Sequence, residues 1–231
     1  MRIIRLLVLT ALLGMTSSLF ADTVSLTFNS VGGANSGGVY TYPYNFTISG
    51  INGTVPMMCD TYANEISFGE SWTANVEPLT TIISNNGKGG LFSNESNAGN
   101  LYGAAGLLYL AAIGKLPGVF TDTNPGDLNW AVWNLFDPTG ATYGNPSTSA
   151  LASAALSAYT SNPQSYYALL SSVYVFTPTP DNTSSITFNP GNETTAPQEF
   201  FGTVPEPASL ALLGSGLLAL GTRLSRRFSN R

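Results

Sequence analysis

The stretch NLYGAAGLLYLAAIGKLPG, residues 100–118, decides how the rest of the chain is expected to fold. Its apolar and small side chains recur every three or four residues, which is the spacing of one helix face. These side chains are Leu101, Ala104, Ala105, Leu108, Ala111 and Ala112. The stretch therefore predicts a helix that Pro117 and Gly118 end, since proline cannot continue the helical hydrogen bonding.

Residues 22 to about 96, which precede this helix, favour strands and turns. Segments rich in β-branched and aromatic side chains show the partial alternation of half-buried strands. These segments are VSLTF (24–28), VYTYPYNFTISG (39–50) and EISFGESWTANVEPL (65–79), with glycine-rich breaks at 32–38 and 85–90.

More helices, and then more strands, are predicted after residue 118. The helices are expected in residues 125–140, 147–161 and 163–172. Asp127 is expected to cap the first of them, because its carboxylate can accept from free amides of the first turn. Asp137 and Pro138 end that helix. Strand character returns in VYVFTP (173–178), SITFNPG (185–191) and PQEFFG (197–202).

The order of strands, helices and strands predicts a mainly β or α+β fold. Because the returning strands can complete the first sheet, we expect a β-sandwich or barrel-like sheet with a helical insertion at about 97–171. The exported passenger domain is expected to span 22–188, and a flexible linker is expected at 189–203.

Positive charge is confined to the two ends of the chain, apart from Lys88 and Lys115. All 13 acidic residues lie between Asp22 and Glu206, so that this middle region has a net charge of −11. Nucleic-acid phosphates would repel it, which excludes nucleic-acid binding.

The N-terminus resembles a secretory signal peptide. Arg2 and Arg5 form a short basic region, an apolar run covers residues 6–15, and small and polar residues follow. We expect signal peptidase to cleave after Ala21, which makes residues 1–21 the signal peptide.

The C-terminus contains a second hydrophobic segment, at about 208–222, which we expect to form a short transmembrane helix. Arg223, Arg226 and Arg227 follow it directly. By the positive-inside rule this basic cluster stays in the cytoplasm, and the preceding chain is placed outside.

Pro205, Glu206 and Pro207, the apolar segment and the arginines occur in the order of a known sorting signal. Residues 204–231 resemble the PEP-CTERM signal of Gram-negative bacteria, which the membrane transpeptidase exosortase is thought to recognise and remove. The resemblance implies an exported protein of the cell envelope or extracellular matrix, held transiently in the inner membrane. Exopolysaccharide or other surface components are the partners that it suggests. The alternative is an ordinary C-terminal anchor that stays uncut.

The residue types argue against an enzyme. The sequence contains no histidine and a single cysteine, Cys59. Histidine-dependent nucleophilic catalysis is therefore impossible, and we expect no catalytic residue, metal or cofactor. Cys59 is a buried small hydrophobe, a reactive thiol, or half of an internal crosslink.

A weaker resemblance bears on Cys59. The sequences CDTYANEISFGESW (59–72) and NWAVWNLFD (129–137) are similar to the paired motifs of bacterial thioester surface domains. In that family a strand cysteine condenses with a helix glutamine. Here Asn129, one methylene shorter, occupies the glutamine position. We expect the fold to be shared and the crosslink between Cys59 and Asn129 to be the minor alternative.

Two further patterns have a structural and a functional interpretation. Trp130 and Trp133 could form a sugar-binding platform, but their apolar helix favours burial in the core. Asp122, Asn124 and Asp127 offer calcium-type oxygen ligands, but a helix-capping turn explains their spacing better.

These observations together predict a non-enzymatic passenger with a structural or adhesive role at the cell surface or in a biofilm. A covalent adhesin using Cys59 and Asn129, and a carbohydrate-binding module, are the alternatives.

Overall fold

The computed structural model describes residues 23–203, except 33–34, 37, 65, 139–145 and 180–196. These residues belong to one compact unit, Ala21–Val204. The predicted signal peptide, the strand at 185–191, the Pro-Glu-Pro tripeptide, the hydrophobic segment and the basic cluster lie outside the described residues. In the part of the chain that is described, no helix is both long and apolar enough to cross a bilayer.

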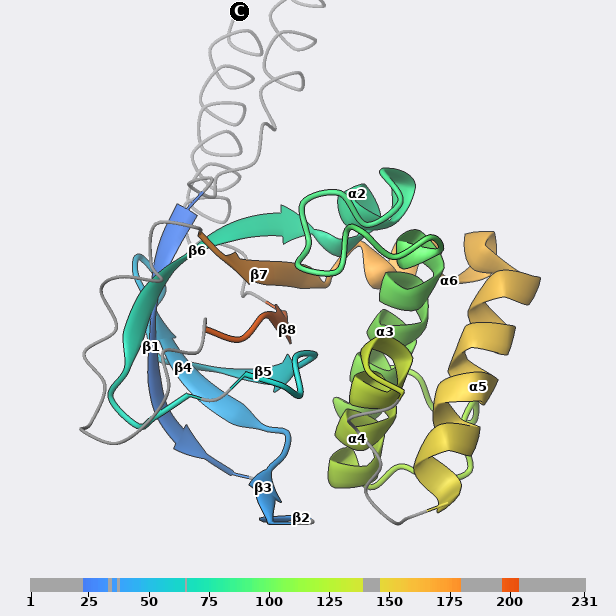
Figure 1. Cartoon of the computed structure of the whole chain (residues 1–231), viewed down its shortest axis with the longest axis horizontal. Helices are drawn as coiled ribbons and strands as arrows, with labels where there is room; N and C mark the ends of the chain where they lie inside the picture. The colour runs from blue at the N-terminus through green and yellow to red at the C-terminus, as the bar shows by residue number, and fades with distance from the viewer. Residues whose placement is uncertain are drawn as a thin grey trace, which may run out of the picture. The chain divides into compact units, whose positions relative to one another are not determined.

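A closed barrel of antiparallel strands forms one half of this unit (Figure 1). The strands follow the order β1, β4, β5, β8, β7, β6 around the barrel, and β6 pairs again with β1. Their bounds are β1 Thr23–Val31, β4 Tyr44–Ile48, β5 Thr54–Cys59, β6 Ser71–Pro78, β7 Tyr174–Pro178 and β8 Phe200–Gly202. A small hairpin, β2 (Asn35–Ser36) with β3 (Val39–Tyr40), lies between β1 and β4 in sequence.

The barrel confirms the predicted mainly β fold with a helical insertion. The strands β7 and β8, which follow the helices in sequence, close the gap between β6 and β5. Because β8 pairs on both sides, the folded domain continues through Gly202. It therefore extends beyond residue 188 and includes part of the expected linker at 189–203.

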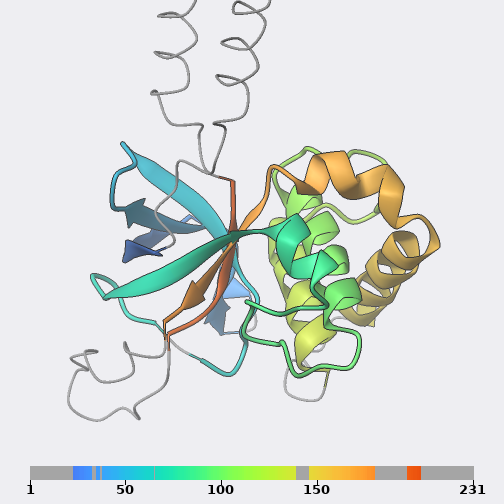
Figure 2. The ribbon, with the colours of Figure 1, turned by 90° about the horizontal axis from the view of Figure 1, so that it is seen from above.

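The helices lie together on one side of the barrel, as Figures 1 and 2 show from two directions. Their bounds are α2 Leu79–Ser84, α3 Ala98–Ala112, α4 Pro125–Phe136, α5 Pro146–Ser161 and α6 Pro163–Leu170. Helix α2 was not expected, because the strand pattern runs into it at Leu79 without a break.

Helix α3 is buried on nearly every side, and its glycines explain how its neighbours come close. A Cβ added at Gly103 would lie 2.4 Å from the ring of Tyr159 in α5. One added at Gly106 would lie 2.5 Å from Leu79 in α2. The cost of glycine in a helix is thus offset by close packing against α2 and α5.

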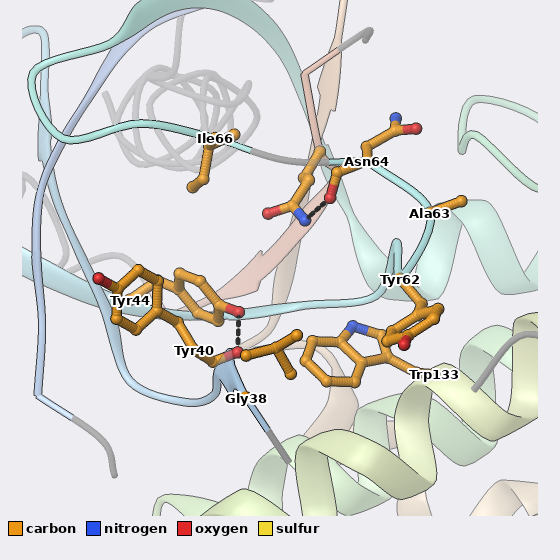
Figure 3. A pocket seen from close by; sticks show the side chains of 10 residues that line it. Gly38, Tyr40, Tyr44, Tyr62, Ala63, Asn64, Ile66 and Trp133 are labelled. Atoms are coloured by element: carbon orange, nitrogen blue, oxygen red, sulfur yellow. Dashed lines mark hydrogen bonds between the residues drawn. The ribbon is translucent and has the colours of Figure 1, made fainter. Parts of the chain in front are cut away.

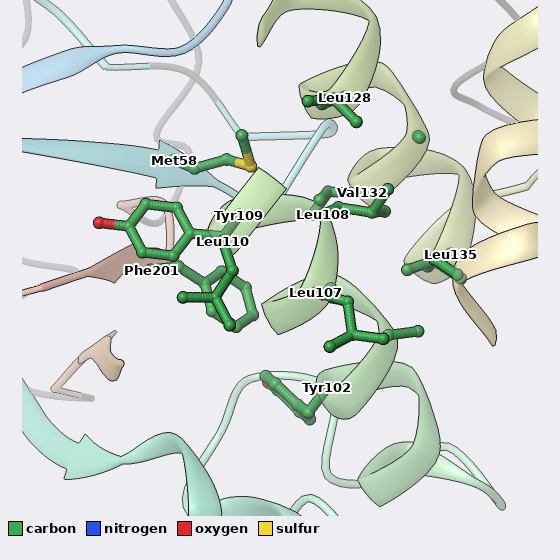
Figure 4. Close-up of a cluster of buried hydrophobic side chains, with 14 of the residues drawn as sticks. Met58, Tyr102, Leu107, Leu108, Tyr109, Leu110, Leu128, Val132, Leu135 and Phe201 are labelled. Carbon is green, nitrogen blue, oxygen red and sulfur yellow. The ribbon is translucent and has the colours of Figure 1, made fainter. Parts of the chain in front are cut away.

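Strand alternation divides the side chains between two cores. In β5, Met57 points into the barrel and Met58 toward the helices. In β8, Phe200 and Phe201 divide in the same way. Figure 4 shows Met58 and Phe201 in the core between the sheet and the helices, with side chains of α3 and α4. The helices therefore cover the outer face of β5, β8 and β7.

The N-cap of helix α4 lies three residues before the expected one. Asn124, not Asp127, is the N-cap, and its side-chain oxygen accepts from the amides of Gly126 (2.8 Å) and Asp127 (3.4 Å). Pro125 takes the first helical position, where a missing N–H costs nothing, and this moves the cap to the residue before it.

Candidate functional site

The structure brings Cys59 and Asn129 together where β5 ends against α4, although 70 residues separate them in sequence. The Nδ2 of Asn129 donates to the backbone carbonyl of Cys59 at 2.8 Å, and its Oδ1 accepts from the amide of Tyr42 at 2.8 Å. Both side chains are fully buried. Asn129 therefore joins α4 to the barrel by satisfying backbone groups of two separate segments.

The thiol of Cys59 turns back on its own chain. Its sulfur lies 3.3 Å from both the backbone nitrogen and the backbone oxygen of Thr61. Burial, followed by the electrostatic influence of the neighbouring Asp60 carboxyl, raises the pKa of the thiol well above its usual value, although hydrogen bonds to Thr61 and Trp133 partly oppose this. Because the thiolate is the reactive form, this environment keeps Cys59 a weak nucleophile.

Next to Cys59 lies a buried acidic cluster, defined here as Asp60 with Glu199 and the donors around them. Glu199 accepts from the hydroxyl of Tyr102 (2.5 Å), the amide of Leu91 (2.8 Å) and the hydroxyl of Thr177. Both carboxyl groups are fully buried. The cluster therefore ties β8 to α3, to β7 and to the loop before α3.

Asp60 and Glu199 differ in their hydrogen-bond partners. The carboxyl of Asp60 accepts at 2.9 Å from the hydroxyl of Thr61, which in turn accepts from the amide of Glu199 at 3.2 Å. Burial, and then the charge of Glu199, raises the pKa of Asp60 well above its usual range. Burial thus favours the protonated form of Asp60, whose Oδ2 has no partner among the described residues, whereas Glu199 accepts from three donors.

Trp130 and Trp133 are buried, with 1% and 2% of their surface exposed, as the core interpretation predicted. Their rings pack edge to face at 4.8 Å, and Tyr62 contacts both of them. The two indoles belong to the barrel core, so that α4 closes one end of the barrel.

A cavity of about 520 Å³ lies beside the indole of Trp133 (Figure 3). It is lined by residues 38–40, Tyr44, residues 62–64 with Ile66, Trp133, and Gln198. Hence the β2–β3 hairpin, the loop after β5 and α4 all contribute. None of the lining side chains that the structure describes is a carboxylate or a basic group.

The acidic cluster and Gln198 were missed in the sequence. In the sequence, Asp60 stands out only as part of the motif that begins at Cys59, and Gln198 and Glu199 only as residues of an expected strand. A signal was present: two polar residues stand before the aromatic pair in PQEFFG. Such residues entering a buried strand need internal partners.

The oxygen-rich turn before α4 acts as a helix cap. The carboxylate of Asp122 accepts from the backbone amide of Asn124 at 2.9 Å, and Asn124 caps the helix. Among the described residues, no group of three or more acidic or cysteine side chains could hold a metal ion.

Residues 203–227 match the PEP-CTERM protein-sorting motif. The chain ends in a sorting signal. The PEP-CTERM match includes the Pro-Glu-Pro tripeptide and the basic cluster, and it begins directly after β8. The motif supports an exported, cell-envelope-associated protein that exosortase processes. No curated protein and no solved structure matches the chain.

Proposed function

We propose that this protein is a non-enzymatic passenger of the PEP-CTERM pathway, with a structural or adhesive role at the cell surface or in the matrix. The observation that supports it best is the sorting motif at 203–227, which directly follows the last barrel strand. Export delivers a finished barrel domain, and the passenger's own properties then define what it does outside the cell.

The nature of the polar cluster supports a non-enzymatic role. A general acid or base must reach the substrate within hydrogen-bond distance. Asp60 and Glu199 are the two carboxyls that the fold brings together, and neither is exposed. Their hydrogen bonds go to groups of the barrel and of α3, which is the arrangement of a structural cluster.

The sorting step is tested by replacing Pro205, Glu206 and Pro207 with alanine in a host that has exosortase. A C-terminal epitope tag follows the tail, and cell fractions are probed for both the tag and the barrel. We expect the wild type to lose the tag and reach the surface fraction, whereas the variant keeps the tag in the inner membrane.

A matched control replaces Ser229 and Asn230, which lie beyond the motif, with alanine. It should be processed like the wild type. If the triple variant is also processed and delivered normally, the proposed sorting route is wrong.

The second candidate is a covalent adhesin in which the sulfur of Cys59 bonds to the side-chain carbonyl carbon of Asn129. The C–N bond would break, and the thiol proton would leave with the amide nitrogen as ammonia. The contact between Asn129 and the Cys59 backbone favours this candidate. The engagement of both amide atoms and the raised pKa of the thiol oppose it.

Alkylation of the denatured protein separates the two candidates. The structural role predicts one alkylated thiol and an intact mass without loss of ammonia. Loss of ammonia together with an unreactive Cys59 would establish the covalent adhesin instead.

A further inference from the structure

The cavity beside α4 has an aromatic rim that solvent can reach. Tyr40 lines the cavity and is 43% exposed, while Phe68 is 55% exposed and lies 5.5 Å from the Tyr40 ring. Phe68 in turn stacks at 5.1 Å on Phe28 of the barrel core. Phe28 therefore supports the ring of Phe68, which in turn contacts Tyr40, and the outer surfaces of both partly exposed rings can receive an apolar partner.

An amide oxygen that lacks a partner lies in the wall of the same cavity. Gln198 is 5% exposed, and its Nε2 donates to the backbone oxygens of Thr61, at 3.1 Å, and Asn64. Its Oε1 has no hydrogen-bond partner among the described residues. A buried acceptor without a partner is costly, and a hydroxyl donor from a ligand would satisfy it.

The shape of the cavity fits a small ligand. Tyr44, Tyr62 and Trp133 line one side of it, opposite Ile66 and Asn64, as Figure 3 shows. The hydroxyl of Tyr44 is fixed by a 2.5 Å bond to the backbone oxygen of Tyr40, which holds the hairpin against the cavity. Its volume of about 520 Å³ lies within the usual range of small-molecule sites.

The charge of the cavity lining and of the surrounding chain favours a neutral ligand. Among the described residues that line the cavity, none carries a carboxylate or a basic group that could pair with a charged ligand. The chain between Asp22 and Glu206, which has a net charge of −11, repels anionic polymers over a longer range. Aromatic faces together with amide groups suit a molecule with apolar C–H faces and many hydroxyls.

We propose that this cavity binds a neutral oligosaccharide, with one sugar ring stacked on Tyr40 and Phe68 and a hydroxyl donating to Oε1 of Gln198. The proposal rests on the adhesive role proposed above and gives it a class of ligand. Trp133 lines the cavity, but it is 2% exposed and the indole of Trp130 does not line it, so the stacking surface is Tyr40 with Phe68 and not a platform of the two tryptophans.

Calorimetric titration tests the proposal with the full chain, in a detergent that has no sugar headgroup. The neutral probes are cellohexaose, laminarihexaose, maltohexaose, mannohexaose and chitohexaose, and oligogalacturonate of equal length is the anionic comparison. We expect at least one neutral probe to bind, and Tyr40→Ala and Phe68→Ala to weaken that binding about tenfold or more. Tyr167→Ala is the matched control, because Tyr167 is 48% exposed on α6, away from the cavity lining.

The outcomes are distinct. Binding that is lost in the two rim variants and kept in Tyr167→Ala supports the site, provided that thermal melting shows all three variants folded. The proposal is overturned if no neutral probe binds, if the rim variants bind normally, or if oligogalacturonate binds as tightly as the neutral probes. Tag loss and surface delivery of the rim variants are measured in parallel. If these variants are delivered normally and no sugar binds, the oligosaccharide proposal is wrong and the proposed sorting route is unaffected.

Discussion

Two neighbouring residues, Gln198 and Glu199, lead into two very different polar regions. The side chain of Glu199 enters the buried acidic cluster, where three donors surround its oxygens. The side chain of Gln198 lines the cavity, where its Oε1 has no partner among the described residues. The Glu199 region is closed, although Oδ2 of Asp60 also lacks a partner among the described residues, whereas the Gln198 region opens onto the cavity.

A residue that stabilises the fold, Glu199, and a residue that lines the cavity, Gln198, are thus neighbours in the chain just before β8. Adjacent residues of an extended chain point in opposite directions, so that β8 and the residues before it can serve both regions. In a low-dielectric interior, the three hydrogen bonds to Glu199 fix the positions of the elements around it. An acceptor left without a partner is instead available to a ligand. Substitutions in the two regions should therefore have opposite consequences for stability and binding.

The largest effect is expected for Glu199→Ala. The substitution leaves the Tyr102 hydroxyl, the Thr177 hydroxyl and the Leu91 amide without their acceptor, which should cost about 3–5 kcal/mol of unfolding free energy. Urea denaturation measures it. Glu95→Ala, at an exposed position, is the control and should change stability by less than about 0.5 kcal/mol. A similar small change for Glu199→Ala would show that the cluster does not stabilise the fold.

A smaller loss, about 2–3 kcal/mol, is expected for Asn129→Ala. It removes the partners of the Tyr42 amide and the Cys59 carbonyl, both at buried positions. Asn100→Ala, at an exposed position of α3, is the control and should be neutral or slightly stabilising. Equal stabilities for the two variants would contradict the structural role of Asn129.

Asp60→Asn should change how stability depends on pH. The folded chain keeps a proton on Asp60 that the unfolded chain releases above its usual pKa of 3.8. The stabilising contribution is therefore complete below 3.8 and decreases as the pH rises toward the folded-state pKa. Asparagine has the same shape and stays neutral, so the variant should gain on the wild type by up to about 1.4 kcal/mol per pH unit in that window. Parallel profiles of unfolding free energy against pH would show that Asp60 is ionised in the folded protein.

The smallest stability effect is expected in the open region. Tyr40→Ala removes a half-exposed ring and should cost only about 0.5–1 kcal/mol, mainly from its contact with Phe68. Thermal melting of both variants compares the stability loss of Tyr40→Ala with that of Glu199→Ala. If Tyr40→Ala destabilises as strongly as Glu199→Ala, the rim belongs to the core and the two regions are not distinct.

Much of the fold was predictable, because the spacing of apolar side chains along the chain follows which face of a helix or strand is buried. The helices of the insertion and the strands flanking it appeared in the patterns, and the returning strands do complete the sheet. Helix α2 was missed, because Leu79 continues an alternating strand and the change to a helix depends on packing against α3. The cap of α4 was misplaced by three residues, because Asp127 and Asn124 are equally good caps until Pro125 fixes the first turn.

The site was less predictable, because it depends on long-range contacts. The local motifs did indicate that Cys59 and Asn129 belong together, and the structure places them in contact. Nothing in the sequence near Glu199 indicates Tyr102, which is 97 residues away, as its partner. The cavity also required the hairpin, the loop after β5 and α4 to meet, which only the closed barrel brings about.

The central claim, that an exported barrel is released from its sorting tail, is tested most directly by the intact mass of the protein recovered from the cell surface. The account predicts a mass that lacks the apolar segment at 208–222 and the arginines after it. A chain that still ends at Arg231 and is recovered from the cytoplasm would contradict it.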